Sequence, residues 1–165
     1  MKRCVSCFAV AAMMVLFALI TPGHAADSPL TPLVKDFKAV TAAYEAFSKK
    51  VDLDVEKVSM RKLCKEMNQM LGMLELSDKR YFDVKSMDKA EKSKLGFMTQ
   101  ILQDFSQSVS TGSQVGRMNE YNKLYKDIQK ELTDEQKKEF NGIHEKTKTL
   151  SKKLFEEIKK LRSMM

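Results

Sequence analysis

Apolar residues recur at steps of three and four along most of the chain after residue 30, and this period constrains the fold more than any other feature. Such spacing places them on one face of an α-helix, whereas a half-buried strand requires strict alternation. No segment shows that alternation, and short polar connections separate the stripes. We therefore predict an all-α fold, an up-and-down bundle of four or five helices. The alternative is a thin, extended helical hairpin or cradle.

Capping residues locate the ends of the expected helices. Thr31 followed by Pro32 predicts an N-cap and a first helical residue. Asp54 is a plausible cap of the second helix, which we expect to end at a break over residues 77–80, and Ser86 or Asp88 opens the third. The predicted inward-facing residues, helix by helix, are Leu33, Phe37, Val40, Tyr44, Phe47 and Val51; Met60, Leu63, Cys64, Met67, Met70, Leu71 and Leu74; Met87, Ala90, Leu95, Met98, Ile101, Leu102, Phe105 and Val109; Val115, Met118, Tyr121, Leu124, Tyr125, Ile128 and Leu132; and Phe140, Ile143, Leu150, Leu154, Ile158 and Leu161.

The amino-terminal residues have the order of a secretory signal peptide. Lys2-Arg3 precedes an uncharged, mostly apolar run over residues 4–20, and Pro22 breaks that run before the small residues Gly23 and Ala25. An apolar run of this length is marginal for spanning a membrane, which favours cleavage over a retained anchor. We predict a cleaved signal over residues 1–25 and a single helical domain over residues 26–165, exported to the periplasm or the extracellular space.

Export limits the chemistry that the mature domain can meet. Loss of Lys2 and Arg3 lowers the formal net charge from +7 to +5, spread over many lysines. We expect the mature domain to bind other proteins and not nucleic acid, and to make no membrane contact after cleavage of the signal. The sequence is also compatible with a homodimer. Cys64 is the one cysteine left in the mature chain, so no internal disulfide can form. We expect it to be buried, with a bond to a second chain or a bound ligand as alternatives.

The mature residues offer no set of catalytic groups. His144 is the one histidine after residue 25, and it stands between Ile143 and Glu145 on a lysine-rich helical segment. A hydrolase triad needs a histidine positioned beside both a nucleophile and a carboxylate. The glutamates alternate with lysines at helical spacing, and we predict that they lie on solvated faces: Glu56, Glu66, Glu75, Glu91, Glu131 and Glu145. We therefore predict a protein that is not an enzyme and that has no catalytic residues and no cofactor.

Three sulfur-containing residues share one face of the second predicted helix. Met60, Cys64 and Met67 stand at positions i, i+4 and i+7, and thioether and thiolate ligands suit Cu(I). The same positions fall on the apolar stripe, and methionine fills irregular helical cores well. A methionine-rich stripe left exposed would instead form an adaptable surface for apolar partners. We expect no metal site, and we keep these three residues as the candidates for one.

One segment carries a recognisable motif. Asn122-Lys123-Leu124-Tyr125 is followed by Leu132-Thr133-Asp134-Glu135-Gln136, and this region resembles the Leu-Thr-x-x-Gln motif of the Spy/CpxP family. The resemblance covers about 20 residues, and its motif residues here are Leu132, Thr133 and Gln136; Thr133 and Gln136 also form a helix capping box. It implies a helical, basic periplasmic stress protein. Spy itself is an ATP-independent chaperone that holds clients on the concave face of a dimer.

These observations predict a non-enzymatic, secreted or periplasmic helical protein that acts by binding other proteins, with a Spy-like holdase chaperone or envelope-stress protein as its specific form. One alternative is a carrier of a soft metal such as copper, or of a small ligand, in the bundle interior. Another is a structural or accessory subunit whose apolar stripe pairs with a second chain.

Overall fold

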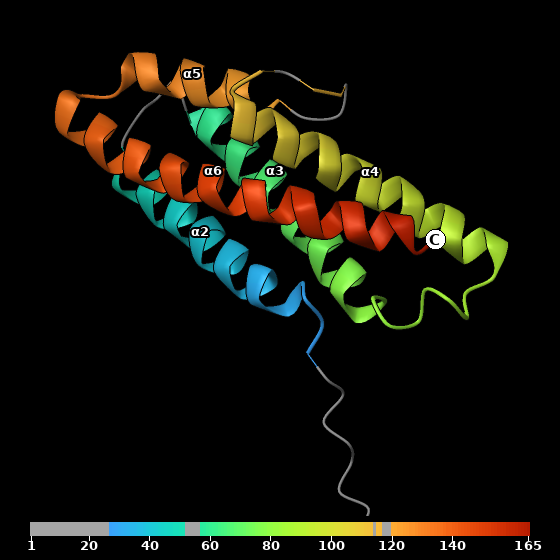
Figure 1. Ribbon diagram of the computed structural model, residues 1–165. Helices are drawn as coiled ribbons and strands as arrows, with labels where there is room; N and C mark the ends of the chain where they lie inside the picture. The colour runs from blue at the N-terminus through green and yellow to red at the C-terminus, as the bar shows by residue number, and fades with distance from the viewer. Residues whose placement is uncertain (1–26, 52–56, 114, 117–119) are drawn as a thin grey trace, which may run out of the picture.

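The computed structural model describes residues 27–51, 57–113, 115–116 and 120–165, and it confirms the all-α fold (Figure 1). Within these residues there are five helices and no strand. The helices are α2 (Thr31–Lys50), α3 (Lys57–Lys79), α4 (Lys89–Thr111), α5 (Tyr121–Glu131) and α6 (Asp134–Ser163).

The four long helices pack as a bundle. α2 contacts α3 and α6, and α4 contacts α3 and α6, so each long helix has two long neighbours. The short helix α5 belongs to the connection between α4 and α6, and it packs on α3 and α4 at one end of the bundle (Figure 1). The helices therefore enclose a core, as the predicted bundle requires, and do not form the thin hairpin of the alternative.

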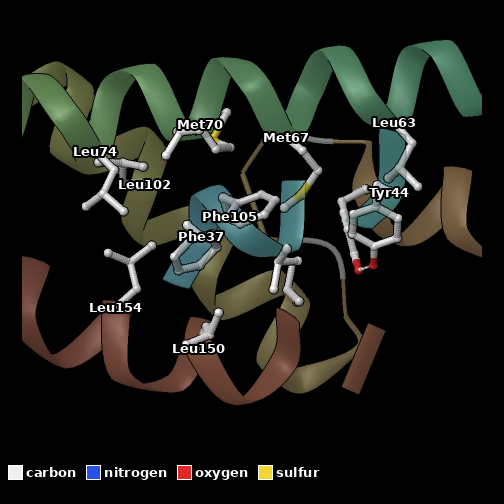
Figure 2. Packing of buried hydrophobic residues seen from close by; sticks show 14 of the residues in the cluster. Phe37, Tyr44, Leu63, Met67, Met70, Leu74, Leu102, Phe105, Leu150 and Leu154 are labelled. Atoms are coloured by element: carbon white, nitrogen blue, oxygen red, sulfur yellow. Dashed lines mark hydrogen bonds between the residues drawn. The ribbon is translucent and has the colours of Figure 1, made fainter. Parts of the chain in front are cut away.

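The predicted apolar stripes form that core. Phe37 of α2, Met67 of α3, Phe105 of α4 and Leu154 of α6 meet in the interior (Figure 2), and each is at most 1% exposed. Burial of a side chain of this size stabilises the fold by about 1.5–3 kcal/mol. Ala90 is an exception to the predicted stripe, since it is exposed at the start of α4.

The predicted capping box of α6 is confirmed, and Asp88, one of the two predicted openings of α4, also forms one. Asp88 caps α4 and exchanges hydrogen bonds with Glu91, and Thr133 does the same with Gln136 at the start of α6. α4 ends at Gly112, whose φ of 73° is the left-handed conformation that glycine adopts without strain. α6 runs without interruption through Asn141-Gly142, although glycine lowers helix propensity there.

Two predicted helix ends are wrong for a shared reason. Thr31 is the first residue of α2 and not its N-cap, because its hydroxyl donates to Asp78 Oδ1 of α3 at 2.8 Å. The predicted break over residues 77–80 does not occur before Lys79, and Asp78 there also accepts from the Ser28 hydroxyl at 2.5 Å. Ser28, Thr31 and Asp78 are residue types that are common in loops, but here their hydrogen bonds join the start of α2 to the end of α3. The predicted cap Asp54 and core residue Met118 lie outside the described residues.

Candidate functional site

The three sulfur-containing candidates occupy different environments. Met60 and Met67 are 3% and 0% exposed in the core, and Figure 2 shows Met67 pointing into the bundle interior. Cys64 is half-buried at the edge of the same helix, where burial raises the pKa of its thiol. Among the described residues, no group of three or more histidine, cysteine, aspartate or glutamate side chains could hold a metal ion. The structure thus uses the two methionines as core packing.

The motif residues act on the backbone at the start of α6. Thr133 N–H donates to Gln136 Oε1 at 2.9 Å, and Gln136 N–H donates to Thr133 Oγ1 at 3.4 Å. Leu132 is buried immediately before this capping box. The three residues fix the turn between α5 and α6, and their side chains are occupied in doing so.

A buried aromatic and polar cluster surrounds Tyr121, the first residue of α5. The hydroxyl oxygens of Tyr121 and Tyr44 lie 2.5 Å apart, and the Tyr44 hydroxyl also lies 3.2 Å from Thr147 Oγ1. The Phe105 ring meets Tyr121 edge-on at a centroid distance of 5.7 Å. All four side chains are fully buried. The hydroxyl chain therefore links α2, α5 and α6 inside an apolar surround, where each group has a partner.

The chain of hydroxyls ends at His144. The Tyr121 hydroxyl lies 2.9 Å from His144 Nδ1, and the imidazole stacks on the Tyr125 ring at a centroid distance of 3.8 Å. Burial lowers the pKa of His144 and raises that of Tyr44 to about 12. The Thr147 hydroxyl donates to the Ile143 carbonyl oxygen at 2.8 Å, so it accepts from Tyr44. With each hydroxyl donating once, Tyr121 then donates to Tyr44, and His144 donates from Nδ1 to Tyr121. His144 is half-buried on α6, and its ring nitrogen joins this internal network.

The structure corrects the sequence-based prediction for Glu66. This residue was expected on a solvated face, yet it is 8% exposed and its carboxylate accepts from the backbone N–H groups of Glu120, at 3.0 Å, and Tyr121, at 3.2 Å. These donors belong to the start of α5, where helical N–H groups lack partners within the helix. Burial outweighs these hydrogen bonds and raises the pKa of Glu66 to about 7. Glu66 therefore caps α5 from α3.

The sequence did contain a signal for this position. Glu66 falls three residues after Leu63 and four before Met70, so it shares their apolar stripe. A carboxylate at such a position is buried with a hydrogen-bond partner, or the helix rotates so that the carboxylate reaches water. Tyr121, Tyr44 and His144 gave no equivalent signal, because their meeting depends on how separate helices pack.

The surface seam between α2 and α6 holds two apolar hollows. Two hollows of about 470 Å³ and 490 Å³ adjoin at Asp36. Gly142 lines the first, and a Cβ built on it would meet nothing within 4 Å. The apolar residues of the two hollows are Pro29, Pro32, Leu33, Ala39, Val40 and Leu150, and the charged residues are Asp36, Glu145, Lys146, Lys152, Lys153, Glu156 and Glu157. We call this seam the α2–α6 groove.

The α2–α6 groove has the dimensions of a peptide site. On α6 it extends from Gly142 to Glu157, which at the helical rise of 1.5 Å per residue is about 22 Å. That length accommodates about four turns of helix or about seven extended residues. Its charged residues carry both signs.

Comparisons with known proteins add no further assignment. No protein-family model matches the chain, and neither does any curated protein or solved structure. The resemblance of the Leu132 region to the Spy/CpxP family therefore stays a prediction from the motif residues.

Proposed function

We propose that this chain is an exported, non-enzymatic helical protein that binds other polypeptides and holds their apolar segments in the α2–α6 groove. The observation that carries the proposal is the groove itself: two adjoining hollows with an apolar floor, on the surface of a bundle whose own stripes are already buried. A concave surface with an apolar floor and polar walls is the usual form of a binding site.

The occupant that fits best is a segment of an incompletely folded polypeptide. Leu33, Val40 and Leu150 offer apolar contact, and the prolines at one end add rigid apolar surface. Charged residues of both signs line the groove, so segments of either net charge are tolerated, as a holdase with many clients requires. The basic composition, the predicted signal peptide and the Spy/CpxP resemblance point to the same role in the periplasm.

Filling the groove tests this function. Leucine at position 142 adds a side chain into the open space of the hollow, whereas leucine at position 72 of α3 adds the same group at a helical glycine with equal free space outside the groove. We expect the wild-type protein at equimolar ratio to slow the light scattering of insulin reduced with dithiothreitol. Gly142→Leu should lose most of that effect, and Gly72→Leu should keep it.

Two results would remove the proposal. Scattering unchanged by the wild-type protein would exclude the holdase. Equal activity of Gly142→Leu and Gly72→Leu would exclude the groove as the binding surface. Export has its own test, because N-terminal sequencing of the protein from the envelope fraction should begin at Ala26. Soluble cytosolic protein that still begins at Met1 would contradict export.

A further inference from the structure

Exposed apolar side chains gather at one end of the bundle. Leu76, Phe82 and Phe97 are 50%, 61% and 63% exposed, and they fall between the end of α3 and the first half of α4. Val58, the other large apolar side chain exposed among the described residues, lies near the start of α3 at the opposite end. We call residues 76–98 the α3–α4 corner. Its exposed apolar groups have no partner in the bundle to explain them.

The turn holds Phe82 outward as part of an ordered structure. Tyr81 N–H donates to Asp78 O at 3.1 Å, and Asp83 N–H donates to Arg80 O at 3.1 Å. Val84 is 1% exposed and anchors the turn in the core. The Tyr81 ring packs edge-on against Phe82 at a centroid distance of 5.4 Å. Exposure of Phe82 is therefore built into the turn.

Cations surround these apolar groups. The corner contains six basic residues and four acidic ones, and within the described part of the chain none of the six basic residues lies in an ion pair. Three of the acids accept hydrogen bonds within the chain: the half-buried Asp78 accepts from Ser28 and Thr31, and the exposed Asp88 and Glu91 form the cap of α4. The basic residues are Lys79, Arg80, Lys85, Lys89, Lys92 and Lys94, and all but the half-buried Lys92 are exposed.

A hollow lies beside the exposed leucine. It has a volume of about 250 Å³, and its apolar floor is formed by Leu76, Met87, Leu95 and Met98. Arg80, Lys94 and Glu91 also line it, so the two cations outnumber the one carboxylate. An apolar recess next to cations suits an amphiphile with an anionic head, because the chain and the head find their partners side by side.

We propose that the α3–α4 corner is a membrane-contacting surface that places Phe82 at the acyl boundary of an anionic bilayer while its lysines meet the lipid phosphates. Aromatic and aliphatic groups beside lysines are the composition of interfacial membrane binding. The terminal helix α6 is no such surface, because its apolar stripe is buried. The corner is a different surface.

The course of the chain favours a bilayer over an acidic protein as the occupant. The described chain begins at Asp27, and Ser28 is hydrogen-bonded to Asp78, which belongs to the corner. The apolar run over residues 4–20 precedes this point in the sequence. A chain whose apolar run was held in a bilayer would therefore enter the bundle at the end that carries the corner.

A single tryptophan tests the proposal, because the chain has none of its own. Phe82→Trp places the probe in the corner, and Val58→Trp places the same probe at the exposed apolar position of the opposite end. With vesicles of equal parts phosphatidylglycerol and phosphatidylcholine, we expect a blue shift and protection from acrylamide for Phe82→Trp only. Vesicles of phosphatidylcholine alone should give neither signal. Added salt at 0.5 M should abolish both, because the Debye length is then about 4–5 Å and the lysine charges are screened from the lipid phosphates.

Vesicle sedimentation separates the contributions without a probe. Phe82→Ser should lower the partition coefficient by about tenfold, an effect that corresponds to loss of partial burial of one phenyl ring, and Val58→Ser should leave it unchanged. Lys85→Glu should lower binding to the anionic vesicles, while Lys123→Glu on α5 should not. Equal spectra for the two tryptophan variants, or binding that ignores lipid charge, would overturn the proposal. Binding of an acidic polypeptide such as polyglutamate with a Phe82→Trp blue shift, but no vesicle binding, would overturn it in favour of a protein partner.

Discussion

Replacing Glu66 with glutamine tests which force dominates at the start of α5. The backbone N–H groups of Glu120 and Tyr121 donate to the Glu66 carboxylate, and these bonds alone would lower its pKa. Burial acts in the opposite direction and is the larger effect, so the pKa is raised from its ordinary 4.5 to about 7. Glutamine keeps an acceptor oxygen for the helix but cannot ionise.

The direction and the size of the pH dependence of stability follow from proton linkage. Because the folded-state pKa of Glu66 lies above the unfolded one, the folded chain binds more protons between pH 4.5 and 7. Its contribution to the free energy of unfolding is full below pH 4.5 and is lost as the pH rises through 7. A separation of about 2.5 pH units at about 1.4 kcal/mol each sets an upper bound of about 3.5 kcal/mol. Partial access of water to the carboxylate lowers this to about 1–2 kcal/mol.

Urea unfolding followed by circular dichroism at pH 5, 6, 7 and 8 measures the effect. The stability of Glu66→Gln relative to wild type should rise by about 1–2 kcal/mol between pH 5 and pH 8. His144 titrates in the same range in both proteins, so its contribution to the pH dependence cancels when the two stabilities are subtracted. A relative stability that stays constant, or that moves in favour of the wild type as the pH rises, would refute the reasoning. It would show that hydrogen bonding dominates burial at this carboxylate.

Four further outcomes are expected. Because burial lowers the pKa of His144, its NMR titration should have a midpoint below 6.5, and the stability that its neutral form supports should be full above pH 6.5 and fall as the pH drops through that midpoint. Thr133→Ala should lower the free energy of unfolding by about 1 kcal/mol through loss of the cap of α6, measured in urea. Phe140→Ala should cost about 3–5 kcal/mol, because it removes a fully buried ring between Phe47 and Tyr125. Iodoacetamide should modify Cys64 more slowly in the folded protein at pH 7.5 than in 8 M urea, since burial raises the thiol pKa.

The helices themselves were predictable because their signals are local. A stripe with a period near 3.6 requires a buried face, and Leu63, Met67 and Leu74 all reach the core as that period predicts. The boxes at Asp88 and Thr133 were equally readable, since both hydrogen bonds of a capping box join residues three apart. Where a helix boundary depends only on its own sequence, the prediction agrees with the structure.

The errors fall where a residue interacts with a distant one. Thr31 and Asp78 are residue types that are common in loops and caps. Their hydrogen bond instead joins the start of α2 to the end of α3. Ala90 has helical spacing but lies in the exposed first turn of α4, because the turn before it is anchored by Val84 instead. Residue type and spacing contain no information about which surface a neighbouring helix covers.

α5 is the clearest case of an element whose place depends on tertiary contacts. A helix of 11 residues is marginal on its own in water, and the structure gives it no side-chain cap from its own N-cap residue. Glu66 supplies the missing acceptor for its first N–H groups, and the Tyr121 side chain ties it to Tyr44 and His144. The sequence therefore predicted that this segment is helical, while its position required the packing of α2, α3 and α6. For the same reason the most connected polar cluster of the protein lies at this helix, where the backbone most needs support from outside.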